Sequence, residues 1–151
     1  MSDRTPIVAG NWKMHLGPTE ARDFAASMLS DLVTVRGVEI VLCPPAISLP
    51  AVHAVLSGTN IKLGAQNMYF EEKGAFTGEI SPTMLQGLCD YVILGHSERR
   101  SYFGETDQTI NAKAKHILGK GLIPIICCGE TIDERTVARA FAQSFVQRNR
   151  K

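Results

Sequence analysis

Polar and titratable side chains follow several short apolar runs of this 151-residue sequence, each at the point where a run ends. Asn11 and Lys13 follow the first run, His96 and Glu98 the fourth, and Glu130 the fifth. Histidine and glutamate are the usual groups for proton transfer, and lysine supplies a fixed positive charge. If the runs are parallel strands, their carboxyl ends bring these groups to one face, as a catalytic site would require.

Each of these residues also has a structural interpretation. A lone lysine after a strand is most often a solvated charge, and a lone histidine at a helix start is more often structural than catalytic. Glu98 with Arg99 and Arg100 is typical of an exposed helix face with local ion pairs. The nucleotide-binding motifs GxGxxG and GxxxxGK[ST] are absent from the sequence. Only the combination of residues can therefore be specific.

The apolar runs alternate with helical patterns. Five strands are predicted near residues 7–10, 38–43, 61–65, 91–94 and 122–127. Five helices are predicted from about residues 18, 48, 81, 106 and 131, with Gly37 ending the first. The last would begin at a capping box, Thr131–Glu134, and carry Val137, Phe141 and Phe145.

Uniformly apolar strands predict a parallel α/β sheet that is covered on both faces. Two architectures fit the alternating order of strands and helices. One is an open doubly wound sheet, and the other is part of a (β/α)8 barrel.

Composition narrows the class of protein. Lys and Arg number 16 and Asp and Glu number 15, which argues against a nucleic-acid partner bound by bulk charge. No apolar run approaches the ~18–20 residues that span a bilayer, and the N-terminus lacks a signal-peptide pattern. None of the four cysteines forms a CxxC pair, so we expect reduced thiols and no metal site. These features favour a cytoplasmic protein without a membrane partner.

Six segments of the sequence together form a family signature. They are Ala9–Met14, Leu42–Pro45, Gly64–Asn67, Gly74–Ser81, Leu94–Arg100 and Cys127–Thr131. In this order and spacing they closely resemble the triosephosphate isomerase family, from about residue 6 to residue 135. The resemblance implies a single partial domain over residues 1–151, with about five βα units of an incomplete (β/α)8 TIM barrel. Residues 136–151 would be a divergent helix or tail.

The resemblance implies a reaction and a role for each site residue. The family interconverts dihydroxyacetone phosphate and glyceraldehyde 3-phosphate through an enediolate, in glycolysis and gluconeogenesis, without cofactor or metal. His96 would be the electrophile, kept neutral by the helix that follows it, which is a known property of this enzyme family. Lys13 would supply positive charge at the substrate. Asn11 would hydrogen-bond the substrate oxygen and help place Lys13, while Glu98 would pair with Lys13 and hold it.

The resemblance also implies a homodimer. The loop Gln66–Ile80 would insert into the partner subunit, with Thr77, Gly78 and Glu79 in the inserted segment and Thr77 reaching the partner's site. Cys127 and Glu130 would support the site from the fifth strand.

Part of the family pattern has no match in the sequence. The family has about 250 residues and eight βα units, and its Tyr-Glu-Pro-Val-Trp segment with the catalytic glutamate, its lid and its phosphate loops are unmatched. We therefore expect these 151 residues to be impaired as an isomerase. One alternative is a non-enzymatic fragment or isoform that associates through the dimer loop or exposed sheet edges. Another is complementation by a separate chain that supplies the remaining strands.

Overall fold

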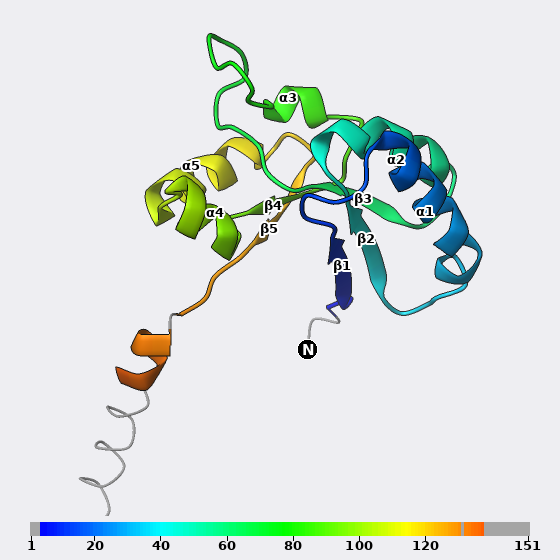
Figure 1. Cartoon of the computed structure of the whole chain (residues 1–151), viewed down its shortest axis with the longest axis horizontal. Helices are drawn as coiled ribbons and strands as arrows, with labels where there is room; N and C mark the ends of the chain where they lie inside the picture. The colour runs from blue at the N-terminus through cyan, green and yellow to red at the C-terminus, as the bar shows by residue number, and fades with distance from the viewer. Residues whose placement is uncertain (1–3, 131, 138–151) are drawn as a thin grey trace, which may run out of the picture.

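A five-stranded parallel sheet organises the protein, for which a computed structural model describes residues 4–130 and 132–137. The strands are β1 (Ile7–Asn11), β2 (Glu39–Cys43), β3 (Lys62–Ala65), β4 (Tyr91–Leu94) and β5 (Ile123–Ile126). Strand order in the sheet follows chain order, and every neighbouring pair is parallel. A doubly wound sheet would reverse its order at a switch point. The incomplete barrel is therefore the correct architecture (Figure 1).

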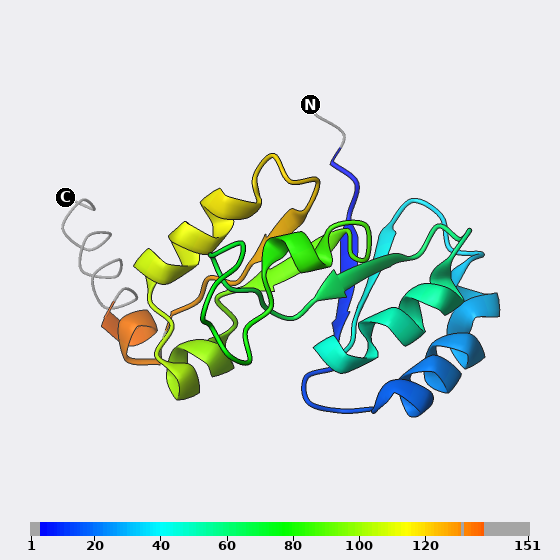
Figure 2. The ribbon, with the colours of Figure 1, turned by 90° about the horizontal axis from the view of Figure 1, so that it is seen from above.

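Helices flank this curled sheet along its outer side (Figure 2). They are α1 (Pro18–Leu32), α2 (Leu49–Leu56), α3 (Pro82–Leu85), α4 (Ser97–Phe103) and α5 (Asp107–Ile117), with a 3-10 turn (Ala46–Ser48) before α2. The α1 and α2 helices lie beside the β1–β3 half of the sheet, whereas α4 and α5 lie beside the other half. Residues 132–137 are also helical.

Alternate residues of the strands pack into two separate clusters. Ile40 and Leu42 of β2 face the helices, where Ala21 and Ala25 of α1 are fully buried. The intervening residues face the inside of the curled sheet, in a smaller cluster made of Val41, Cys43, Tyr91 and Ile93. This alternation follows from the two-residue period of a strand. One face of the sheet therefore carries the main core, and the other begins the interior of a barrel.

The two outer strands differ from the sequence-based expectation of full coverage. Ile7 and Val8 of β1 are 48% and 60% exposed, and Ile123 and Ile126 of β5 are each 51% exposed. The expectation holds for β2, β3 and β4 and is wrong for β1 and β5. Each outer strand has a neighbour on one side only, and the apolar pattern alone does not distinguish an edge strand from a central one.

Some helix boundaries also differ from the sequence-based ones. The α1 helix ends at Leu32 rather than at Gly37, which adopts a φ of 76° in the turn before β2. The α3 helix is a single turn that stops before Leu88, because Gln86 is already extended. Of the last predicted helix, residues 132–137 are seen, whereas Thr131, Phe141 and Phe145 lie outside the described residues.

Packing in the inner cluster leaves no room for a side chain at Gly64. A Cβ atom at this position would lie 2.6 Å from Cys43 Sγ and 3.1 Å from Val41 Cγ1. We expect Gly64→Ala to lower the free energy of unfolding by about 1–3 kcal/mol, measured by urea denaturation. Gly129→Ala is the control, since no atom lies within 4 Å of the added methyl group. Equal stability of the two variants would contradict this packing.

Candidate active site

Lys13 leaves the end of β1 in an unusual backbone conformation. Its φ is 53°, in the left-handed region that costs a residue with a side chain roughly 1–2 kcal/mol. The Asn11 side chain offsets part of this cost, because its Oδ1 accepts a hydrogen bond from the Lys13 N–H at 3.0 Å. Asn11 therefore fixes the turn that directs Lys13, and strain of this kind concentrates at functional sites.

Gln66 fixes the same turn from the other side. Its Nε2 donates one hydrogen bond to the Lys13 carbonyl at 2.9 Å and another to the Cys43 carbonyl at 2.8 Å. One amide thus joins the carboxyl ends of β1, β2 and β3. Sequence reasoning placed Gln66 after the third strand but did not include it among the site residues. The position of this glutamine directly after a predicted strand could have indicated the role, since side-chain amides often bind the free carbonyl groups where strands end.

His96 occupies the N-cap position of α4, directly after β4 and Gly95. Its Nδ1 accepts a hydrogen bond from the Glu98 backbone N–H at 3.3 Å. The Glu98 Oε2 atom also lies 3.5 Å from Nδ1. We assign Nδ1 as the acceptor, because the backbone N–H can only donate and lies closer to Nδ1 than the carboxylate oxygen does. In the neutral form of the ring, the proton is then on Nε2, which leaves that nitrogen as a donor.

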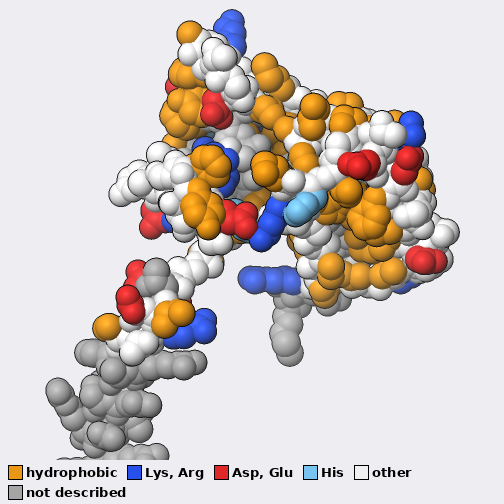
Figure 3. Space-filling model, viewed as in Figure 1, with side chains coloured by type: hydrophobic (Ala, Val, Ile, Leu, Met, Phe, Trp, Pro, Cys, Tyr) orange, Lys and Arg blue, Asp and Glu red, His pale blue; other side chains and the backbone are white. Residues whose placement is uncertain are grey.

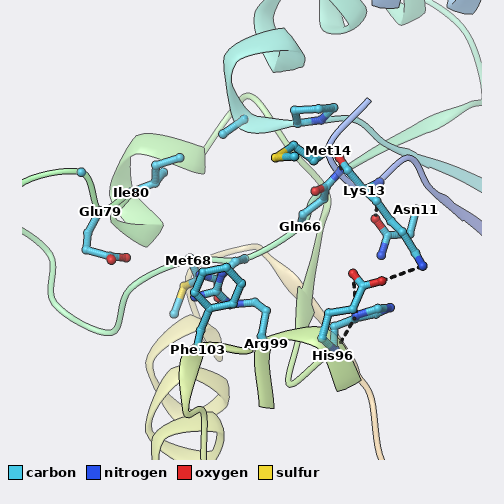
Figure 4. A pocket seen from close by; sticks show the side chains of 15 residues that line it. Asn11, Lys13, Met14, Gln66, Met68, Glu79, Ile80, His96, Arg99 and Phe103 are labelled. Atoms are coloured by element: carbon cyan, nitrogen blue, oxygen red, sulfur yellow. Dashed lines mark hydrogen bonds and ion pairs between the residues drawn. The ribbon is translucent and has the colours of Figure 1, made fainter. Parts of the chain in front are cut away.

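Lys13 and Glu98 form an ion pair across this site, with Nζ 2.7 Å from Oε1 (Figure 4). The hydrogen bond from Lys13 is the main cause that lowers the pKa of Glu98, and the positive charge of Lys13 acts in the same direction. Both side chains are about half exposed. The pair therefore orients the lysine without burying its charge, so Lys13 Nζ can still meet a bound anion.

These groups share one pocket of about 380 Å³, which the sticks in Figure 4 outline. Asn11, Lys13, His96 and Glu98 line it together. Other lining residues come from the segments after β1, β2, β3 and β4, and they are Met14, Pro45, Ala46, Gln66, Asn67, Met68, Gly78, Glu79, Ile80, Arg99 and Phe103. Thr77 is exposed and is not part of the lining.

Cys127 and Glu130 do not line this pocket. They line a second hollow of about 670 Å³, which His96 and Arg100 also border. Burial raises the pKa of the Cys127 thiol. Glu130 forms an ion pair with Arg135 at 2.6 Å. The structure thus places both residues near His96, with the Glu130 carboxylate already paired.

A buried ionic network behind the pocket was not predicted from the sequence. The Glu105 Oε1 atom is 2.6 Å from both Lys113 Nζ and Arg99 Nε, and Lys113 also donates to Asn67 Oδ1 at 2.8 Å. Burial acts to raise the pKa of Glu105, but the hydrogen bonds from Lys113 and Arg99 outweigh it and the net shift is downward. Because Arg99 and Asn67 line the pocket, this network fixes part of its wall. No sequence spacing indicates that Glu105 and Lys113 are buried.

The cysteines described by the structure are free thiols. Burial raises the pKa of Cys43 and of Cys89 to about 12, so both stay protonated near neutral pH. Across residues 4–130 and 132–137, no three His, Cys, Asp or Glu side chains gather in a way that could hold a metal ion. No helix in that part of the chain has the length and apolar character needed to cross a membrane.

Comparison with known proteins gives a consistent result. The sequence model of the triosephosphate isomerase family matches residues 6–149. A triosephosphate isomerase of Carboxydothermus hydrogenoformans is 56% identical over 133 residues, which cover 87% of this chain and 53% of the relative. One of Dehalococcoides mccartyi (strain CBDB1) is 53% identical over 131 residues, which cover 87% and 52%. The chain thus spans about half the length of the curated relatives it matches.

The ion pair at the pocket predicts a titration shift. In Lys13→Met, the pKa of Glu98 should rise toward the ordinary glutamate value, followed by NMR of the side-chain carboxyl carbon. The folded-state pKa is lowered, so the pair stabilises the fold above the ordinary glutamate range. That contribution is lost as the pH falls through the lowered pKa.

Lys62→Met is the matched control, because Lys62 pairs with Asp90 rather than with Glu98. An unchanged Glu98 titration in Lys13→Met, or an equal shift in Lys62→Met, would show that the observed pair does not control this carboxylate.

Proposed function

This chain belongs to the triosephosphate isomerase family, and we propose that it carries the electrophilic part of that family's active site. The substrates would be dihydroxyacetone phosphate and glyceraldehyde 3-phosphate, interconverted through an enediolate without a cofactor. We place this reaction in the cytoplasm, in glycolysis and gluconeogenesis. The observation that carries the proposal is the convergence of Asn11, Lys13 and His96 on one pocket.

The proposed chemistry divides between a base and an electrophile. The base removes a proton from the carbon next to the carbonyl, and the electron pair of that C–H bond forms the double bond of the enediolate. Negative charge then develops on the former carbonyl oxygen. The His96 Nε2–H donates a hydrogen bond to this oxygen, and the Lys13 ammonium stabilises both the oxygen and the phosphate. The isomerisation is complete when the proton is returned to the former carbonyl carbon and the hydroxyl proton of the adjacent carbon moves to the former carbonyl oxygen, which leaves the new carbonyl on that adjacent carbon.

Glu98 and Glu130, the carboxylates that follow β4 and β5, fit the role of base poorly. Glu98 is paired with Lys13, and Glu130 is paired with Arg135. We therefore propose that the base comes from outside these 151 residues, and that the 151 residues by themselves isomerise slowly. Loss of a general base typically costs about 10²–10⁴-fold in rate.

We also propose a homodimer in which the segment Thr77–Glu79 contributes to the interface. Large apolar side chains around the pocket support this proposal, because Met14 is 93% exposed, Ile47 72% and Phe103 67%. Figure 3 shows apolar side chains bordering the hollowed face. Exposed apolar surface at a concave site is typical of a protein–protein interface, and a loop of a second copy would cover it.

One observation favours a second candidate function. The apolar side chains of β1 and β5 are about half exposed, and exposed parallel edges promote association. A non-enzymatic fragment or isoform could therefore bind another chain through these edges or through the dimer loop. Such a protein would associate without ever gaining isomerase activity.

An activity assay on a fusion protein separates these functions. Residues 1–135 are joined to the segment that follows the matched region in the Carboxydothermus hydrogenoformans relative. We expect the 151-residue chain alone to isomerise glyceraldehyde 3-phosphate at least about 100-fold more slowly than that relative. The fusion should come within about tenfold of it, and His96→Gln in the fusion should lower kcat by about 10²–10⁴-fold.

His53→Gln in the same fusion is the control, because His53 lies on α2 and is not part of the pocket lining. Light scattering on the same samples should give the mass of two fusion chains. A folded fusion that stays inactive, or one in which both histidine variants lose activity equally, would refute the catalytic proposal and favour the binding function.

A further inference from the structure

The loop between β3 and α3 is fastened at Glu72 to two other elements. The Glu72 carboxylate forms an ion pair with Lys120, which lies in the turn between α5 and β5. The Glu72 backbone carbonyl accepts a hydrogen bond from Thr83 Oγ1 on α3 at 3.2 Å. Glu72 therefore connects its own loop to α3, which follows soon after in the sequence, and to the turn before β5, which lies 48 residues away. Figure 1 shows this loop projecting beside α3.

Lys120 is itself held in place by the backbone around it. It lies between two glycines with left-handed φ values, 85° at Gly119 and 76° at Gly121. Its N–H donates to the Ile117 carbonyl at 3.0 Å, and its own carbonyl accepts from Gln86 Nε2 at 2.8 Å. Gln86 directly follows α3, so a closed circuit of contacts runs from the loop to the turn, to the end of α3 and back to the loop through Thr83.

The charges around Glu72 favour its ionised form. The hydrogen bond from Lys120 and the charge of Lys120 lower the pKa of Glu72, and His116 and Lys73 act in the same direction more weakly. His116 Nε2 lies 3.6 Å from the same carboxylate oxygen. Glu72 is half exposed and Lys120 is 24% exposed, so the pair remains sensitive to salt.

We propose that Glu72 and Lys120 form a tether that positions the loop 66–80 against the outer layer of the sheet. The loop closes at its base where the Tyr69 N–H donates to the Ile80 carbonyl at 2.8 Å. Between these points, the Tyr69 ring packs against the rings of Phe70 and Phe76. Holding Glu72 in place limits how far these rings and the base of the loop can separate.

The tether acts on the pocket through the end of the loop, since Gly78, Glu79 and Ile80 line it. Glu72 and Lys120 are thus positioning residues, because neither lies on the pocket. The inference rests on the proposed function for the importance of this loop to a partner subunit. The test of the tether requires neither catalysis nor a partner subunit, so its result is independent of whether the proposed isomerase function is correct.

Amide hydrogen exchange of the 151-residue chain tests the tether directly. We expect Glu72→Gln to accelerate exchange of the Tyr69 and Glu79 amides about two- to fivefold, as loss of a partly exposed ion pair allows. Lys120→Met should give the same result from the other side of the pair. The double variant should add little to either single variant, because both remove one interaction. About 1 M salt should reduce the difference from the unsubstituted protein.

Glu71→Gln is the matched control, because the described part of the chain shows no ion pair for this neighbouring carboxylate. Equal loop exchange in Glu71→Gln and Glu72→Gln would overturn the tether. So would acceleration of the same size in the amides of β2–β4, since the tether acts locally. Unchanged exchange in both Glu72→Gln and Lys120→Met would also contradict it.

Discussion

The side-chain amide of Gln66 is the contact on which the arrangement of the site depends. It binds the carbonyls of Lys13 and Cys43 at once, so it links the carboxyl ends of the first three strands. Arg100 has a similar role further along the sheet, because it donates to the carbonyls of Gly95 and Cys127. Together the two side chains fix the carboxyl edge of the sheet, where the β-ladder ends and backbone carbonyls need other partners.

The hydrogen bonds at this edge stabilise the strained backbone of Lys13 and the charged groups around it. Lys13 keeps a left-handed backbone because Asn11 and Gln66 bind its N–H and its carbonyl, while Glu98 binds its ammonium group. The backbone of Glu98 in turn selects the acceptor nitrogen of His96. Each polar group is thus oriented by a neighbour before any substrate arrives. Such preorganisation is how a site stabilises charge that develops during a reaction.

The sequence predicts most of the framework because its strands and caps obey local rules. Pro18 and Pro82 begin helices, Ser81 caps α3 through its hydroxyl, and the five apolar runs become five strands. The exposure of Val8 and Ile126 could not be read from the pattern, because apolar runs do not reveal which strands lie at the edge. The burial of Lys113 against Glu105 could not be predicted from the sequence either, since their contact depends on how α5 packs. The family motifs identified Asn11, Lys13 and His96 as candidates, whereas the two hydrogen bonds of Gln66 were found only in the three-dimensional structure.

The central claim is that the Glu98 backbone N–H occupies His96 Nδ1 and leaves Nε2 as the donor nitrogen of the ring. Nitrogen-15 NMR of the His96 ring tests it most directly, at a pH near 8 where imidazoles are generally neutral. The structure predicts a protonated Nε2 and an unprotonated Nδ1 that is hydrogen-bonded to the Glu98 amide. A ring with its proton on Nδ1 would contradict the account, because His96 could not then donate a hydrogen bond to a substrate oxygen.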